Sequence, residues 1–263
     1  MRRFGSALLF FILLTGCSPR RVNLPSGAGA PFSGFADAYA EAVATCRGTR
    51  TMTATLSLSG TAGGARIRGD VDAGFAAPSN VRLEGRAPFG RPVFVFVARD
   101  ERTATLLLPR DNRILRAAAP DAIVEALTGV RLGPPELGAM IAGCGFGAGD
   151  PTGGRQYEGG WVVVESASGN DYLRRNDGAW RLAASTRGPL TIEYSDYRSS
   201  RPGTIRLRAG DEHGSQTALT VRLSDVDINI PLAPEVFHAD IPPDAAPLTL
   251  DELRSAGPLG ERR

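Results

Sequence analysis

The chain has 263 residues, of which 42% are hydrophobic and 22% are charged. This length is enough to bury a substantial core in one domain. The formal net charge is only +2, and the basic residues, all arginines, are dispersed along the chain, which argues against nucleic acid as a partner.

Residues 1–16 have the organisation of a secretory signal peptide. Arg2 and Arg3 precede an apolar run from Ala7 to Leu14. That run is far shorter than the roughly 20 apolar residues that a membrane-spanning helix needs. Removal of residues 1–16 takes away two arginines and no acidic residue, so the formal charge of the chain falls from +2 to 0.

The signal ends in Leu14-Thr15-Gly16-Cys17, which is similar to a bacterial lipobox, in which the cysteine is lipidated and becomes N-terminal. The alternative is an ordinary signal peptide with a chance cysteine. An acyl anchor of the palmitate type on Cys17 would hold the protein on a membrane, since each buried methylene contributes about 0.8 kcal/mol. In bacteria where an aspartate at the next position avoids sorting, Ser18 indicates the outer membrane, facing the periplasm; the inner membrane stays open. Residues 17–31 are rich in Pro, Gly and Ser and are predicted to form a flexible tether.

A helix and a long β region are expected next. Ser33 is predicted to cap a helix that runs to Arg47 and stops at Gly48. Apolar and polar residues then alternate with the period of a strand that is buried on one face. Such runs lie near 54–59, 64–73, 79–87, 103–108, 160–167, 179–186, 190–197, 203–209, 219–224 and 225–230.

One helical insert interrupts the strands. Pro120 to Thr128 and Pro134 to Ala142 are predicted to be short helices that end at Gly129 and Gly143. The run Val93 to Ala98 is apolar on both faces, so it is either a central strand covered on both sides or a strand that lines an apolar cavity. These elements predict one domain over 32–247, followed by an extension over 248–263.

Two cysteines, Cys46 and Cys144, remain after cleavage. In an oxidising compartment such a pair is expected to form a disulfide, which would stabilise the fold by about 4–5 kcal/mol in the chain-entropy model. The alternative is two buried free thiols. No metal or other cofactor is expected, because His213 and His238 are the only histidines and neither cysteine has a ligand-spaced neighbour.

Three stretches carry a resemblance to a known family, together with the lipobox. They are RLEGRAPFGRPVFVFV, IVEALTGVRLGPPELGAMIAGC and DVDINIPLAPEVFHADIP. Over residues 32–243 the chain resembles the LolB-type lipoprotein localisation factors of the LolA/LolB-like fold. The resemblance implies a mainly β, α+β fold: an incomplete antiparallel β-barrel of about 10–11 strands with an N-terminal helix and a two-helix lid.

The resemblance also implies a function. Family members hold acyl chains in an apolar cavity, receive lipoproteins from a soluble LolA-like carrier and insert them into the outer membrane. Their protruding membrane-insertion loop falls on Pro88, Phe89 and Gly90; the alternative is that Phe89 folds back onto the core or lid. The cavity candidates, for each of which ordinary core packing is the alternative, are Phe94, Phe96, Leu106, Leu108, Ile123, Leu127, Met140 and Ile141.

The chain departs from the family in two places. Met140 stands where the family has a tryptophan, and the extension Leu248 to Arg263 has no assigned role. The other candidate is a lipid-sensing module or an envelope-assembly scaffold, and a monomer is expected in either case. An enzyme is not expected, because the sequence has no Gly-x-Ser-x-Gly motif, and Asp211, Glu212 and His213 look like a polar hairpin turn.

Overall fold

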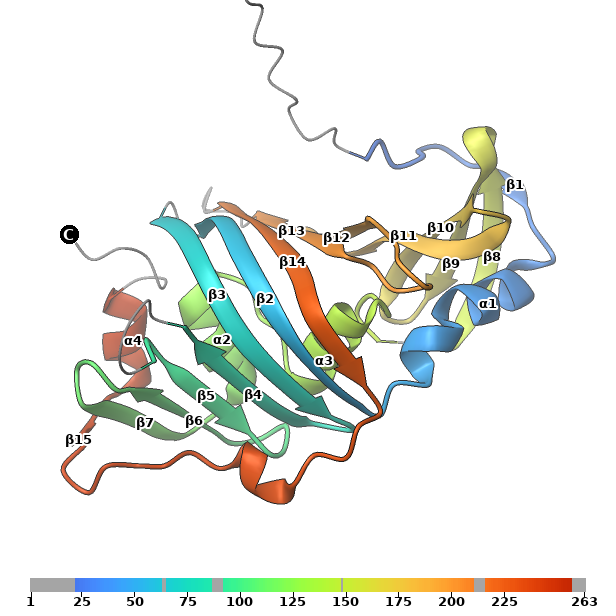
Figure 1. The fold of residues 1–263 in the computed structure, drawn as a ribbon. Coiled ribbons are helices and arrows are strands. Elements are labelled where there is room, and N and C mark those ends of the chain that lie inside the picture. The colour runs from blue at the N-terminus through green and yellow to red at the C-terminus, as the bar shows by residue number, and fades with distance from the viewer. Residues whose placement is uncertain (1–21, 63–64, 87–91, 148, 211–215, 257–263) are drawn as a thin grey trace, which may run out of the picture.

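The structure, a computed structural model, describes residues 22–62, 65–86, 92–147, 149–210 and 216–256 (Figure 1). The predicted lipidation site Cys17, the predicted loop Pro88-Phe89-Gly90 and His213 lie outside these residues. Within them, no helix is long and apolar enough to span a membrane.

The described strands form one open sheet in the order β1-β8-β9-β10-β11-β12-β13-β14-β2-β3-β4-β5-β6-β7-β15. Neighbours are antiparallel, except that β15 runs parallel to β7. The predicted fold class, an incomplete antiparallel barrel with helices, is therefore confirmed. The strands are β1 (Ala30–Pro31), β2 (Thr51–Ala62), β3 (Ala65–Ala76), β4 (Asn80–Gly85), β5 (Val95–Ala98), β6 (Ala104–Leu108), β7 (Arg113–Ala118), β8 (Pro151–Tyr157), β9 (Trp161–Ser166), β10 (Gly169–Asn176), β11 (Ala179–Arg187), β12 (Leu190–Ser195), β13 (Thr204–Gly210), β14 (Gln216–Ile228) and β15 (Ala246–Pro247).

Helices cover the sheet in two separate places (Figure 1). Helix α1 (Phe35–Arg47) packs against β8 to β11, whereas α2 (Pro120–Thr128) and α3 (Pro134–Ala142) lie across β2 to β5 and form the lid. Helix α4 (Leu250–Ala256) packs beside α2. Two short 3-10 turns, η1 (Glu158–Gly160) and η2 (Pro234–Phe237), complete the described elements.

Both lid helices begin and end where the sequence predicts. Each starts at a proline, whose preset φ and missing N–H suit the first helical position. Gly129 and Gly143 follow the helices with φ of 72° and 92°, a left-handed conformation that favours glycine. The predicted cap of α1 is wrong by one residue: Gly34, not Ser33, precedes the helix, and Ala38 donates its N–H to the Gly34 carbonyl.

The described sheet has fifteen strands where 10–11 are predicted. The strands missed are β1, β7, β8, β10 and β15. Strand β8, sequence PTGGRQY, contains a Gly-Gly pair and no apolar alternation, because it lies near the sheet edge and has no fully buried residue. The two expected runs at 219–224 and 225–230 belong mainly to one strand, β14. A β-bulge between Ser224 and Asp227 shifts its alternation by one residue.

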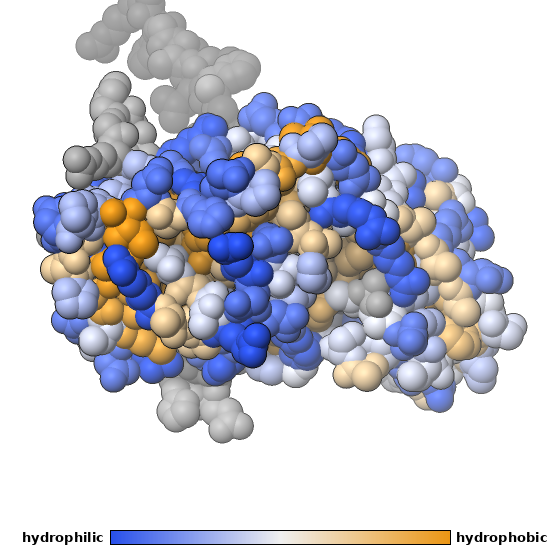
Figure 2. Space-filling model, turned by 90° about the horizontal axis from the view of Figure 1, so that it is seen from below, coloured by the Kyte–Doolittle hydropathy of each residue, from blue (hydrophilic) through white to orange (hydrophobic). Residues whose placement is uncertain are grey.

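The apolar run Val93–Ala98 is covered on both faces of the sheet. Phe94 and Phe96 are buried in the main core, on the face beneath the lid. Val95 and Val97 belong to a smaller core on the opposite face, which Phe237 and the segment after β14 cover. Figure 2 shows this lower side of the molecule, where polar residues surround small apolar patches.

The predicted C-terminal extension is part of the domain over its described length. The Leu248 N–H donates to the Ile114 carbonyl of β7 at 2.7 Å, and Leu248 and Leu253 are buried in the main core. A capping box begins α4, since the Thr249 N–H donates to the Glu252 carboxylate at 2.8 Å and the Glu252 N–H donates to Thr249 Oγ1 at 3.2 Å. The extension thus covers the edge of β7 and supports α2.

The described part of the predicted tether, 22–31, lies partly on the domain. Ala30 and Pro31 pair with β8, and the Tyr157 hydroxyl donates to the Gly27 carbonyl at 3.2 Å. Arg155 also donates to the Ala28 carbonyl. Residues 27–31 of the predicted tether are therefore held against β8.

Candidate functional site

A cavity of about 210 Å³ lies between the sheet and the lid. Its apolar lining consists of Leu56, Leu58, Ile67, Val71, Phe75, Leu83, Val93, Phe94 and Phe96 from β2 to β5, Leu207, Leu219 and Val221 from β13 and β14, and Val124, Leu127, Leu132, Leu137, Met140 and Ile141 from the lid and its loop. The cavity opens beside the exposed residues Arg68, Gly69, Asp70 and Arg86.

Strand pairing creates this lining. Leu56 pairs with Val71, and Leu58 pairs with Gly69 on one side and Val221 on the other. Because successive side chains alternate across a sheet, this register puts one apolar row beneath the lid. The intervening polar residues face the other side, where Ser57 donates to Asp70 at 2.7 Å.

Gly69 leaves the opening free of side-chain atoms at its own position. A Cβ atom built there meets nothing within 4 Å. Beside it, Arg86 forms an ion pair with Asp72 at 2.6 Å, with both side chains about half exposed. This pair lies on the side of the sheet where Thr55 contacts Asp72 and Ser57 contacts Asp70, away from the lid, so it does not cover the opening. As an exposed pair it contributes little to stability.

The structure brings five of the eight predicted cavity residues to the cavity wall. Phe94, Phe96, Leu127, Met140 and Ile141 line it. Leu106, Leu108 and Ile123 do not line it but are buried in the main core, because α2 packs against β6 at the side of the cavity. Met140, which replaces the tryptophan of the resembling family, lies on the wall as a flexible apolar side chain.

Most of the wall on β2, β3 and β14 lies outside the predicted cavity residues. Leu56, Leu58, Leu219 and Val221 carry the period-2 signal of a buried face, and that signal identified them as core residues. Phe75 had no such signal. The register that places these residues opposite the lid depends on long-range pairing.

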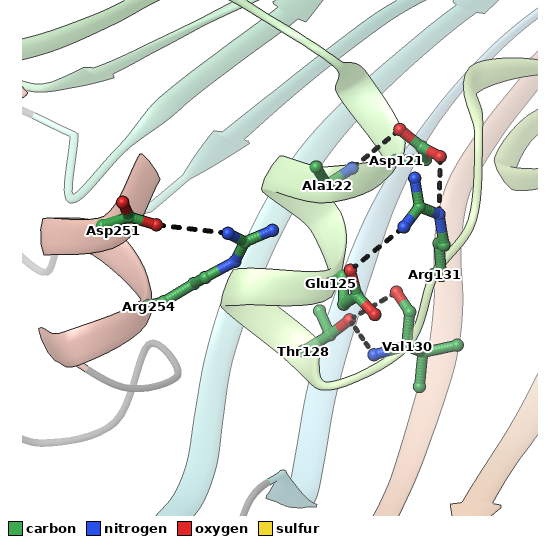
Figure 3. A network of polar contacts seen from close by, with 8 residues as sticks. All are labelled: Asp121, Ala122, Glu125, Thr128, Val130, Arg131, Asp251 and Arg254. Atoms are coloured by element: carbon green, nitrogen blue, oxygen red, sulfur yellow. Dashed lines mark hydrogen bonds and ion pairs between the residues drawn. The ribbon is translucent and has the colours of Figure 1, made fainter. Parts of the chain in front are cut away.

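Helix α2 is attached to the sheet and to its neighbours by polar contacts at its ends (Figure 3). Arg131, which follows α2, binds Asp121 at 2.8 Å and Glu125 at 3.6 Å. At its last residue, the carbonyl of Thr128 accepts a hydrogen bond from Thr217 Oγ1 of β14 at 2.9 Å. The side of α2 away from these residues faces α4, whose Arg254 binds Asp251 at 3.3 Å.

Helix α3 is joined to the half of the sheet that α1 covers. The Tyr194 hydroxyl donates to the Met140 carbonyl at 3.0 Å, and Arg187 forms an ion pair with Glu136. Just beyond α3, Cys144 forms a disulfide with Cys46 of α1, with 5.6 Å between the Cα atoms. The disulfide therefore ties the lid to the helix that covers the other half of the sheet.

A buried polar cluster lies beneath α1. Ser185 donates its hydroxyl to Asp171, and the Gly145 N–H donates to the Tyr194 hydroxyl at 3.0 Å. Burial raises the pKa of Asp171 to about 6, against an opposing effect of the Ser185 hydrogen bond. Burial, with the nearby Asp171 carboxylate, also raises the pKa of the Tyr39 hydroxyl.

No cluster of three or more metal-ligating side chains occurs in the described residues. Asp225 and Asp227 are exposed on β14. The feature with the geometry of a binding site is thus the apolar cavity.

The cavity and the open sheet define the class of the fold, a helix-covered incomplete barrel. No protein-family model matches the sequence, and no curated protein matches it. Two solved structures are similar at the level of the fold. A LolA superfamily protein from Nitrosomonas europaea is 12% identical with a TM-score of 0.51, over 81% of this chain and 99% of that chain. An outer membrane lipoprotein-sorting protein domain from Vibrio parahaemolyticus is 11% identical with a TM-score of 0.50, over 76% of this chain and 94% of that chain.

These likenesses show a LolA-like fold. At identities of 12% and 11% they do not distinguish the LolB type from other members. Because one fold can serve many functions, the function of this protein has to follow from its cavity.

Proposed function

We propose that this protein binds an acyl chain in the cavity beneath its lid. The observation that carries the proposal is an apolar wall of some eighteen side chains around a space of about 210 Å³ that opens at Gly69. An apolar cavity of about 150 Å³ in another protein holds benzene. The present cavity therefore suits a segment of an acyl chain.

Apolar burial supplies the driving force without covalent chemistry. Moving a chain from water into the cavity is favourable by about 25 cal/mol for each Å² of apolar surface that leaves water. A membrane interior offers the chain a similar environment, so release needs only contact with a bilayer. We therefore propose a binding protein rather than an enzyme.

We further propose that the protein is lipidated on Cys17 and faces the periplasm from the outer membrane, where it inserts lipoproteins. The lipobox, the fold and the cavity support this together. The docked segment Gly27–Pro31 would keep the domain close to the membrane. A LolA-like soluble carrier is the expected donor, and Phe89 is the residue proposed to enter the bilayer.

The test is uptake of a fluorescent fatty acid by delipidated protein, with Gly69→Phe as the blocking variant. A phenylalanine at residue 69 enters open space and obstructs the opening, so uptake should fall at least about tenfold while the fold is kept. Gly210→Phe is the matched control, because Gly210 also has nothing within 4 Å of its Cβ position but does not line the cavity.

Two outcomes would contradict acyl binding: no uptake by the unmodified protein, or equal uptake by Gly69→Phe and Gly210→Phe. Transfer is tested separately. A purified acylated lipoprotein is mixed with the anchored protein and with vesicles, and its incorporation into the vesicles is followed. Binding without incorporation would support binding and reject transfer.

A lipid-sensing or scaffold role is the second candidate. It is favoured by the size of the cavity, about 210 Å³, which suits part of one chain rather than a complete lipoprotein anchor. Depletion of the protein separates the two: general missorting of lipoproteins supports transfer, whereas a defect confined to one envelope process supports the sensing role.

A further inference from the structure

A second pocket lies along the face of α3 that carries Pro135, Gly138, Ala139 and Ala142. Its volume is about 170 Å³, and its inner wall is formed by Met52, Ala139, Ala142 and the disulfide of Cys46 and Cys144. Thr49, Arg50 and Asn80 also line it, and Arg50 is exposed. The pocket is thus apolar inside with polar residues around it.

One side chain belongs to the walls of both the pocket and the cavity. Phe75 of β3 contributes to the walls of both. It pairs with Met52 on β2 and Val81 on β4 and is 6% exposed, so its ring is held inside the molecule between the two spaces.

The lid residue opposite Phe75 is a glycine. A Cβ atom at Gly138 of α3 would lie 3.6 Å from Cδ1 of Phe75. Glycine costs helix stability in the middle of a helix, but here it leaves room between α3 and the ring. The ring shared by the two walls therefore faces a lid residue without a side chain.

We infer that Phe75 sets the length of acyl chain that the cavity accepts, and that the second pocket is a subsite for the distal methyl end of a longer chain. The inference rests on the proposed acyl binding. The subsite is continuous with the cavity once the ring is displaced, and its inner wall offers a chain end the same apolar surroundings.

The test measures dissociation constants for a series of saturated fatty acids from decanoate to icosanoate. Affinity should rise about fourfold with each methylene that is buried, then stop rising at the length where the chain end meets Phe75. In Phe75→Ala the plateau should move to longer chains. The longest acids should then bind at least about tenfold more tightly than they bind to the unmodified protein.

Two further variants make the result specific. Phe237→Ala removes an equally buried phenylalanine, 4% exposed, from the opposite face of the sheet and should leave the plateau unchanged. Adding Gly138→Leu to Phe75→Ala should return the plateau to shorter chains, because the leucine enters the space that the ring has left. If Phe75→Ala does not fold, Phe75→Leu should show the same shift with a smaller amplitude.

The outcomes separate this inference from the proposed function. Binding by the unmodified protein with the same plateau in Phe75→Ala would overturn the inference and leave acyl binding intact. The inference also fails if Phe237→Ala shifts the plateau as far. No binding of any fatty acid by the unmodified protein would overturn both.

Discussion

The two halves of the sheet are covered by helices in different ways. Beneath α1, in what we call the filled half, the interior holds fully buried apolar side chains such as Leu173 and Leu182, together with the buried polar residues Asp171 and Ser185. Beneath the lid, the wall is apolar and encloses about 210 Å³ of space. Empty space forfeits the packing contacts that a dense interior provides, so the hollow half contributes less to stability for each residue.

The two halves are connected through helix α3. Helix α3 is joined to the filled half by the disulfide, by Tyr194 and by the ion pair of Arg187 with Glu136. The filled half is thus a frame that holds α3 in place beside the cavity, where empty space provides few packing contacts. Three measurements test whether the filled half holds the lid in place.

Loss of the disulfide should have the largest effect. The double variant Cys46→Ala with Cys144→Ala removes a link across a sequence separation of 98 residues. In the chain-entropy model such a link contributes about 4–5 kcal/mol to the free energy of unfolding. Urea denaturation should show the same loss of unfolding free energy in the double variant and in the reduced unmodified protein. A loss below about 1 kcal/mol would mean that the frame holds the lid without the disulfide.

Matched leucine truncations compare the two halves directly. Leu182 is fully buried in the filled half, and Leu182→Ala should lower the free energy of unfolding by about 3–4 kcal/mol. Leu58 is only partly buried and borders the cavity, so Leu58→Ala should cost about 1 kcal/mol, because few packing atoms are left without a partner. Equal losses in denaturant titrations would show that the cavity wall is packed as densely as the filled half.

Local signals explain why some elements were predictable. The lid helices were placed to the residue because proline at the start and a left-handed glycine at the end act within a few residues. Strands β8 and β10 were missed because their sequences, PTGGRQY and GNDYLRRN, show little alternation. Their strand structure depends on partners elsewhere in the sheet.

The cavity wall was only partly predictable for a related reason. Phe96 and Leu106 pair with each other on β5 and β6 and are both fully buried, yet only Phe96 meets the cavity. Residue type cannot separate them, since both are large and apolar. Whether a buried face is filled or hollow depends on where the lid lies over the sheet, which no local pattern encodes.

A third measurement concerns the buried carboxyl group of the filled half. Burial raises the pKa of Asp171 from its ordinary value of 3.8 to about 6. Between these values the native protein holds a proton that the unfolded chain has lost, so the free energy of unfolding decreases as the pH rises. The stabilisation is complete below about pH 4 and is lost by about pH 6, a change of about 2–3 kcal/mol from this group.

Asp171→Asn isolates that contribution. Asparagine keeps an oxygen that can accept the Ser185 hydrogen bond but does not titrate, whereas all other carboxyl groups titrate in both proteins. The difference in unfolding free energy between the two proteins, measured in urea at intervals from pH 4 to pH 7, should therefore move in favour of the variant as the pH rises. A constant difference would show that Asp171 is solvated in the native state. Water would then reach the interior of the filled half, and that half could not be the dense frame that supports the lid.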